Sequence, residues 1–180
     1  MKEPLWIPST DRINKSNLMQ FMSFVKANYD FSGATYSDLH NWSINNIELF
    51  WESIWKYSGI IHSQSYRQVF IRKEIYDSQW FTDSKLNFAQ NLLRFNDNHT
   101  AIISHRENYP SIKISYKQLN ELVTRTAFGL KNLGVKKGDR VAAFISNVPE
   151  AVITMLAVTS LGAIWSSTSP DFGIQGVIDR

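Results

Sequence analysis

Cysteine is absent from this sequence of 180 residues. A chain without cysteine has no disulfide framework, no thiol nucleophile and no cysteine metal site, which suits a reducing compartment. Long apolar stretches are missing too: no run approaches the roughly 20 apolar residues of a membrane-spanning helix, and the amino terminus lacks the apolar core of a signal peptide. These absences predict a cytoplasmic protein with no membrane partner.

An excess of one charge is also missing. Lys and Arg total 19 against 16 Asp and Glu, so the formal net charge is only +3. Basic residues gather around one turn, at Lys131, Lys136, Lys137 and Arg140. Such a cluster can bind phosphate or nucleic acid, but it is also typical of a solvated loop between a helix and a strand, and the loop is favoured. We expect no nucleic-acid partner.

Aromatic residues, in contrast, make up 13% of the chain, and most lie in its first half. Thr35 fits a helix start that buries Tyr36, Leu39 and Trp42, and an apolar stripe at helical spacing runs from Ile47. The expected elements of this half are helices at 11–26, near 36–42, at 47–58 and at 87–94, with an extended stretch at 66–72.

Short helices and loops are not expected to build a core from their aromatic side chains alone. A large aromatic residue stabilises a fold only when it has a surface to pack on. We therefore expect this half to lie against a larger body; lining a ligand groove is the less favoured role for the aromatic stripe. The tryptophans concerned are Trp42, Trp51, Trp55 and Trp80.

From about residue 98 the pattern changes to alternating helices and strands. Ser115 and Gln118 form the spacing of a capping box, and Pro149 suits the first position of a helix. Val141–Ile145 is apolar throughout, as in a parallel strand that is covered on both faces. The expected order is a hairpin of 101–103 and 112–114, a helix at 116–133, a strand at 141–145, a helix at 149–161 and a strand from 163.

Helix, strand, helix and strand joined by short turns are the repeating unit of a doubly wound, mainly parallel sheet. The predicted fold class is α/β, with a helical N-terminal extension (1–95) packed on the first part of such a domain (96–180). Two or three parallel strands are too few for a finished domain with helices on both faces. We therefore expect the sequence to be incomplete.

Few residues suggest chemistry directly. The histidines match no two-histidine helical metal spacing, and no G-x-S-x-G elbow is present. Gly134–Asp139 lacks the Gly-Lys-Ser/Thr ending of a phosphate loop and lies where a helix leads into a strand, so we interpret it as a structural turn. Ser166–Gly173 follows a strand and precedes a helix, which is where α/β folds bind ligands. A polar connecting loop and a binding loop are equally consistent with it.

Three segments resemble the opening of the adenylate-forming enzymes, the acyl-CoA synthetases in particular: GDRVAA at 138–143, NVPEA at 147–151 and LGAIWS at 161–166. Three more resemble the acetoacetyl-CoA synthetases within that family: PLWIPS at 4–9, LNFAQNLL at 86–93 and, most specifically, WSSTSPDFG at 165–173. The departures are small, with Phe88 where a tyrosine is usual, Gln90 where a glutamate is usual, and Thr82-Asp83 where Pro-Gly is common.

The resemblance implies a two-step reaction. The acid attacks ATP to give an acyl-adenylate, and the thiol of CoA then displaces AMP. It also implies Mg²⁺, a Ser/Thr/Gly-rich phosphate loop that ends in Pro-Lys, and a lysine from a mobile C-terminal domain. These motifs do not occur before Arg180. The chain is therefore expected to be the N-terminal part of an acetoacetate–CoA ligase, inactive alone and without catalytic or metal-binding residues.

By the same resemblance, one loop borders the tunnel that takes the pantetheine arm of CoA. A related synthetase acting on another short acid, and a non-enzymatic interaction module, are the alternative functions. The predicted CoA-binding residues are Ser169, Pro170, Asp171, Phe172 and Gly173.

Overall fold

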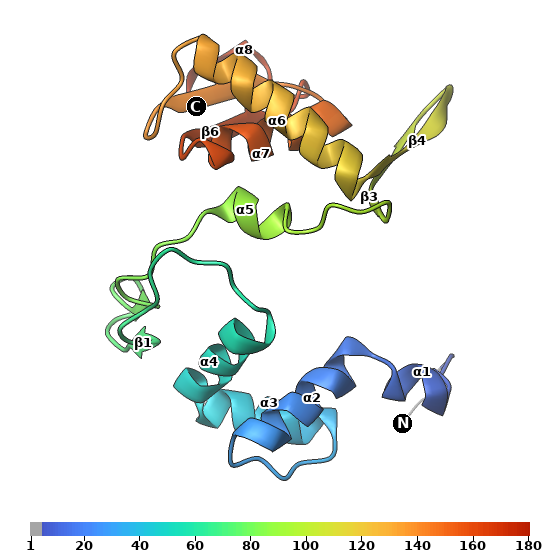
Figure 1. The fold of residues 1–180 in the computed structure, drawn as a ribbon, viewed down its shortest axis with the longest axis vertical. Helices are drawn as coiled ribbons and strands as arrows, with labels where there is room; N and C mark the ends of the chain where they lie inside the picture. Colours follow the sequence, from blue (N-terminus) through green and yellow to red (C-terminus); the bar gives the residue numbers. More distant parts are fainter. Residues whose placement is uncertain (1–4) are drawn as a thin grey trace. The chain divides into compact units, whose positions relative to one another are not determined.

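Two helices open the first part of the chain, where the sequence predicted one. The structure, a computed structural model, describes residues 5–180 (Figure 1). Helix α1 spans Thr10–Asn14 and helix α2 spans Asn17–Asn28. The single helix predicted at 11–26 is wrong because Ser16 is extended, at φ −70° and ψ 149°, and its Oγ accepts a hydrogen bond from the Met19 N–H at 3.3 Å. A new N-cap thus interrupts the helix.

Helix α3, Tyr36–Asn45, begins with a capping box. The Thr35 Oγ1 accepts from the Asp38 N–H at 3.2 Å, and the Asp38 carboxylate accepts from the Thr35 and Ala34 N–H groups at 2.8 and 2.9 Å. These backbone hydrogen bonds, that from Thr35 first, hold the pKa of Asp38 below its usual value. The predicted burial of Leu39 and Trp42 is confirmed, whereas Tyr36 is exposed.

Tyr36 occupies the first position of α3, and its ring stacks on that of His40 rather than entering the core.

Helix α4, Ile47–Tyr57, completes a core that the sequence did not lead us to expect. Phe50 and Ile54 of α4 pack against the buried residues of α2 and α3, and the Trp42 ring lies 6.3 Å from that of Phe50. Three short helices thus enclose a cluster together, but of the four tryptophans that were expected to form no core by themselves only Trp42 belongs to it, and Trp51 and Trp80 are exposed. Its buried members are Phe21, Met22, Val25, Leu39 and Trp42.

The segment after α4 has little regular structure. Strand β1, Phe70–Ile71, pairs antiparallel with strand β2, Gln79–Trp80. The extended stretch predicted at 66–72 is thus a strand over two residues only. The chain divides into two compact units after Lys85, and each unit is described by itself.

The second unit begins with helix α5, Phe88–Leu92, close to the helix predicted at 87–94. Asn87 caps it, with its Oδ1 accepting from the Gln90 N–H at 3.0 Å. The Asn87 Nδ2 also donates to the Thr159 and Ser160 carbonyl oxygens at 3.0 and 3.3 Å. The Asn87 side chain therefore forms hydrogen bonds with backbone groups both at the start of α5 and at the end of α7, which have no partner within their own helices.

The predicted hairpin and capping box are confirmed. Strand β3, Thr100–Arg106, pairs antiparallel with strand β4, Tyr109–Ser115, and helix α6, Tyr116–Asn132, follows at once. The Ser115 Oγ accepts from the Gln118 N–H at 3.2 Å, while the Gln118 side chain accepts from the Ser115 N–H at 2.9 Å.

A parallel strand pair with a helical crossover forms the rest of the second unit. Strand β5, Arg140–Phe144, pairs with strand β6, Ile164–Thr168, with helix α7, Pro149–Ser160, between them, and helix α8, Ile174–Ile178, follows. Figure 1 shows α7 beside α6. The predicted α/β class is thus confirmed. The core of this unit contains Ala89, Ile114, Leu119, Val123, Ile153, Leu156 and Ala157.

One face of the strand pair is open among the described residues. Val141 and Ala143 are half-buried, whereas Phe144 and Ile164 remain exposed. The apolar strand predicted a sheet covered on both faces. Over residues 5–180 only one face is covered, by α7, which packs against β6.

Candidate functional site

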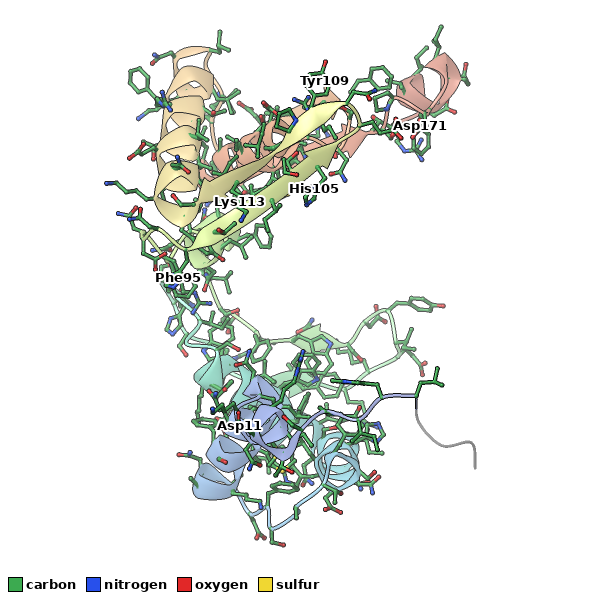
Figure 2. All side chains as sticks on the ribbon, turned by 90° about the vertical axis from the view of Figure 1, so that its right-hand side faces the viewer. Asp11, Phe95, His105, Tyr109, Lys113 and Asp171 are labelled. Carbon is green, nitrogen blue, oxygen red and sulfur yellow. The ribbon has the colours of Figure 1, made fainter. Side chains whose placement is uncertain are left out.

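The predicted ligand loop lies at the carboxyl edge of the parallel strands. It continues directly from β6, and the Ile145 N–H, just after β5, donates to the Thr168 carbonyl at 3.1 Å. The ends of both strands thus meet where the loop begins, the edge at which open α/β sheets bind ligands. Asp171 of this loop lies next to α8 (Figure 2).

Hydrogen bonds close the loop into a turn. The Phe172 N–H donates to the Ser169 carbonyl at 3.1 Å, with Pro170 and Asp171 between them. The Ser169 Oγ donates to the Asp171 carboxylate at 2.8 Å and accepts from the Asp171 N–H at 3.4 Å. Proline at the second position of a four-residue turn has its φ already set for that conformation. The structure therefore brings four of the predicted residues together, and Gly173 follows as the N-cap of α8.

Arg180 joins this loop, although the sequence analysis did not select it. Its guanidinium carbon lies 4.1 Å from the centre of the Phe172 ring, and its Nη1 donates to the Gly176 carbonyl at 2.9 Å. A Cβ at Gly176 would lie only 3.2 Å from the Phe172 ring, so the absence of a side chain there allows the packing. No local pattern in the sequence indicates this contact, because Phe172 and Arg180 lie eight residues apart on either side of α8.

The glycine-containing turn at 134–139 is a connection, as predicted. The Lys136 N–H donates to the Asp139 carboxylate at 2.9 Å, and the Gly138 N–H donates to the Gly162 carbonyl at 3.0 Å. Gly138 has φ +89°, which favours glycine. The turn lies where β5 begins, at the opposite strand end from the ligand loop.

Other chemistry-bearing side chains are scattered. Figure 2 shows His105 on the β3–β4 hairpin, where its Nδ1 lies 2.6 Å from the Ser111 Oγ on the solvent-exposed surface. Among residues 5–180, no three His, Asp or Glu side chains are grouped so that they can hold a metal ion. No helix in this described range has the length and apolar character needed to cross a membrane.

Comparison with known proteins identifies the family. The AMP-binding enzyme model matches residues 88–178, half of the chain, including the strand pair and the ligand loop. The chain belongs to the AMP-binding enzyme family. Enzymes of this family act on small-molecule substrates and use ATP and CoA. A second model, the acetyl-coenzyme A synthetase N-terminus, matches residues 36–92.

Among the AMP-binding enzymes, the chain is similar to acetoacetyl-CoA synthetases in particular. The chain is 36% identical to acetoacetyl-coenzyme A synthetase from Rhizobium meliloti over 99% of its own length, and 40% identical to acetoacetyl-CoA synthetase from Xenopus tropicalis over 98%. The solved acetoacetyl-CoA synthetase from Streptomyces lividans superposes with a TM-score of 0.89 at 30% identity, over 99% of this chain and 28% of that one.

The chain spans about a quarter of the length of these relatives, 28% and 26% of the two proteins from Rhizobium meliloti and Xenopus tropicalis. The loop and the end of the following helix bring together a hydroxyl, a carboxylate and a guanidinium, from Ser169, Asp171 and Arg180. Phe172 is 41% exposed and offers an apolar ring beside them.

Proposed function

We propose that this chain is the N-terminal part of an acetoacetate–CoA ligase, which forms acetoacetyl-CoA from acetoacetate, CoA and ATP, with release of AMP and diphosphate. The observation that supports the proposal is likeness over the whole chain: acetoacetyl-CoA synthetases are 36% to 41% identical over 98% to 99% of its length. The likeness therefore includes both units and the specific 165–173 segment.

The chemistry explains why ATP is required. A carboxylate is a poor electrophile, whereas an acyl group joined to AMP has a good leaving group, which the CoA thiol displaces. The chain contributes a scaffold and one loop to this reaction, and Mg²⁺ is proposed as the ion that accompanies ATP in the whole protein. We also propose that 1–95 forms the N-terminal extension and 96–180 the start of the large domain, with the two family models as support.

We further propose that Ser169–Gly173 borders the path of the CoA pantetheine arm. Support comes from the position of the loop at the carboxyl edge of β6 and from its closed turn, which presents the Phe172 ring partly to solvent. A pantetheine arm is long and mostly apolar with two amides, so a ring beside polar side chains suits it.

The function is tested by measuring diphosphate release. The full-length protein is expected to release diphosphate with acetoacetate and ATP and to form acetoacetyl-CoA when CoA is added. Purified residues 1–180 are expected to release none, because the sequence contains no Ser/Thr/Gly-rich loop ending in Pro-Lys. Acetoacetate-dependent release by residues 1–180, or a full-length protein inert toward short acids, contradicts the proposal.

A second acid has specific support. Malonamoyl-CoA synthetase from Penicillium aethiopicum is 37% identical over 99% of this chain. The diphosphate assay should therefore compare acetoacetate, malonamate, acetate and propionate at equal concentration. The proposed specificity requires the highest kcat/KM with acetoacetate; a higher value with malonamate assigns the protein to that acid.

The proposed CoA loop is tested with Phe172→Ala in the full-length enzyme. Removing the ring is expected to raise the KM for CoA about fivefold, corresponding to ~1 kcal/mol of aromatic contact, and to leave the KM for ATP unchanged. Phe128→Ala, an exposed aromatic residue on α6, is the matched control and is expected to change neither constant. An unaltered KM for CoA in the Phe172 variant removes the loop from the CoA path.

A further inference from the structure

Glu52 of helix α4 accepts hydrogen bonds on both of its carboxylate oxygens. Oε2 accepts from the Tyr29 hydroxyl at 3.0 Å and from the Lys56 Nζ at 3.0 Å, and Oε1 accepts from the Tyr66 hydroxyl at 3.2 Å. The Glu52 side chain is only 26% exposed. A carboxylate with this many donors, largely withdrawn from water, is unlike the solvated ion pairs of a protein surface.

The three donors come from different parts of the first unit. Lys56 lies one turn further along α4, Tyr29 directly follows α2, and Tyr66 belongs to the segment 60–85. Glu52 therefore connects α4 both to the end of α2 and to the irregular segment after α4.

Backbone hydrogen bonds join the two arms of the segment 60–85 to each other, such as that from the Arg67 N–H to the Thr82 carbonyl at 2.8 Å and that from the Phe81 N–H to the Val69 carbonyl at 2.7 Å. Its two strands contain two residues each, and one further bridge joins Gln64 to Lys85. Its contact with α4 includes a backbone hydrogen bond from the Ile60 N–H to the Trp55 carbonyl at 3.4 Å and two aromatic pairs: the Trp55 ring lies 5.2 Å from that of Tyr66 and 4.8 Å from that of Phe81. Phe81 has φ +45°, a conformation that a large side chain adopts only when its surroundings enforce it.

We propose that Glu52 acts as a charge-dependent latch: its ionised carboxylate holds the segment 60–85 closed on α4 through the Tyr66 hydroxyl, and loss of the charge or of the phenolic protons releases that segment. The aromatic contacts of Trp55 hold the segment 60–85 against α4 by apolar packing, which does not fix the orientation of the segment. The hydrogen bonds to Glu52 supply the direction, and the ring of Tyr66 belongs to both sets of contacts.

The pKa values of the partners agree with this role. Burial, and then the neighbouring Glu52 carboxylate, raise the pKa of Tyr29 and of Tyr66, while Lys56 acts in the opposite direction. Burial also acts to raise the pKa of Glu52, but the hydrogen bonds from Lys56, Tyr29 and Tyr66 prevail, so its pKa is lowered. The hydrogen bond to Glu52 raises the pKa of Lys56.

These directions fix the pH range of the latch. Because the pKa of Glu52 is lowered, its ionised form stabilises the fold above the pKa of an unfolded glutamate, and this stability is lost as the pH falls through the folded pKa. Because the pKa values of Tyr29, Tyr66 and Lys56 are raised, their protonated forms stabilise the fold below the unfolded pKa values, and this stability is lost as the pH rises through the folded pKa values. The latch is therefore complete near neutral pH. It weakens at acid pH, below the ordinary pKa of a glutamate, where Glu52 gains a proton, and at alkaline pH, above the ordinary pKa of a tyrosine, where the tyrosines and Lys56 lose theirs.

Glu52→Gln tests the proposal in the full chain, because glutamine keeps the size of the side chain and removes its charge. Hydrogen exchange of the amides in 60–85 at neutral pH is expected to rise on the order of tenfold, the factor that a hydrogen bond to a charged group provides. The alkaline end of the tyrosine absorbance titration is expected to move to lower pH, because the Glu52 carboxylate no longer raises the pKa of Tyr29 and Tyr66. Glu48→Gln, an exposed acid one turn earlier on α4, is the control.

The exchange measures release of the segment, and the tyrosine titration measures the loss of burial and of the Glu52 charge beside the phenols. Tyr66→Phe is the second variant: it keeps the ring against Trp55 and removes one hydroxyl, and it is expected to raise exchange in 60–85 even if the glutamine variant folds poorly. Unchanged exchange in both variants, or equal changes with Glu48→Gln, overturns the latch.

Discussion

Replacing Leu156 by alanine is expected to lower the free energy of unfolding of the second unit by about 2–5 kcal/mol, the range for large-to-small changes in a packed core. Leu156 is 2% exposed and lies in the middle of α7. It belongs to the core cluster that α6, α7 and α5 share, together with Leu119 and Ala89. Alanine there leaves a cavity, because the helices on either side are fixed by their own caps and turns.

Hydrogen exchange of the α6 and α7 amides during a urea series measures this loss in the second unit alone. Leu133→Ala is the matched control, since Leu133 is 83% exposed at the end of α6 and its truncation is expected to change stability by less than about 0.5 kcal/mol. A Leu156 variant as stable as the Leu133 variant would show that α7 does not carry the core of this unit.

The second large effect is expected at Asn87. Asn87→Ala removes the N-cap of α5 and leaves the last carbonyls of α7 without their side-chain donor, so the second unit is expected to lose about 2 kcal/mol. Urea denaturation read by amide exchange in α5 and α7 measures it. Asn132→Ala, at the exposed end of α6, is the control and is expected to be nearly neutral.

Asn87→Asp separates the two roles of this side chain. Aspartate still caps α5, but it has no donor for the Thr159 and Ser160 carbonyls and places a negative charge beside the C-terminal end of α7. Exchange is therefore expected to rise in α7 and to stay low in α5. Equal protection of both helices in the aspartate variant would mean that the link to α7 contributes nothing.

Features that depend on residues within one helical turn could be predicted from the sequence. The capping boxes at Thr35 and Ser115 and the start of α7 at Pro149 are of this kind, because donor, acceptor and backbone conformation are all local. The exception is Ser16. Its capping hydrogen bond competes with continuation of the helix, and spacing of apolar residues alone does not show which prevails.

The position of the ligand loop could also be predicted, since it follows from the order of strands and helices. Its partner Arg180 could not, because the cation–aromatic contact with Phe172 depends on the exact path of α8. The same holds for Asn87, whose second set of hydrogen bonds reaches carbonyls at Thr159 and Ser160, more than 70 residues along the chain. Local patterns contain no signal for such contacts.

The two units that meet after Lys85 contain very different numbers of tryptophans. Trp165 lies on β6, opposite Val141 of β5, whereas the other tryptophans precede Lys85. Intrinsic fluorescence therefore reports chiefly on the first unit. A version of the protein in which Trp165 is the sole indole would give an optical signal from the parallel strand pair alone. In that version Trp165 serves as a spectroscopic label for following the second unit as it folds.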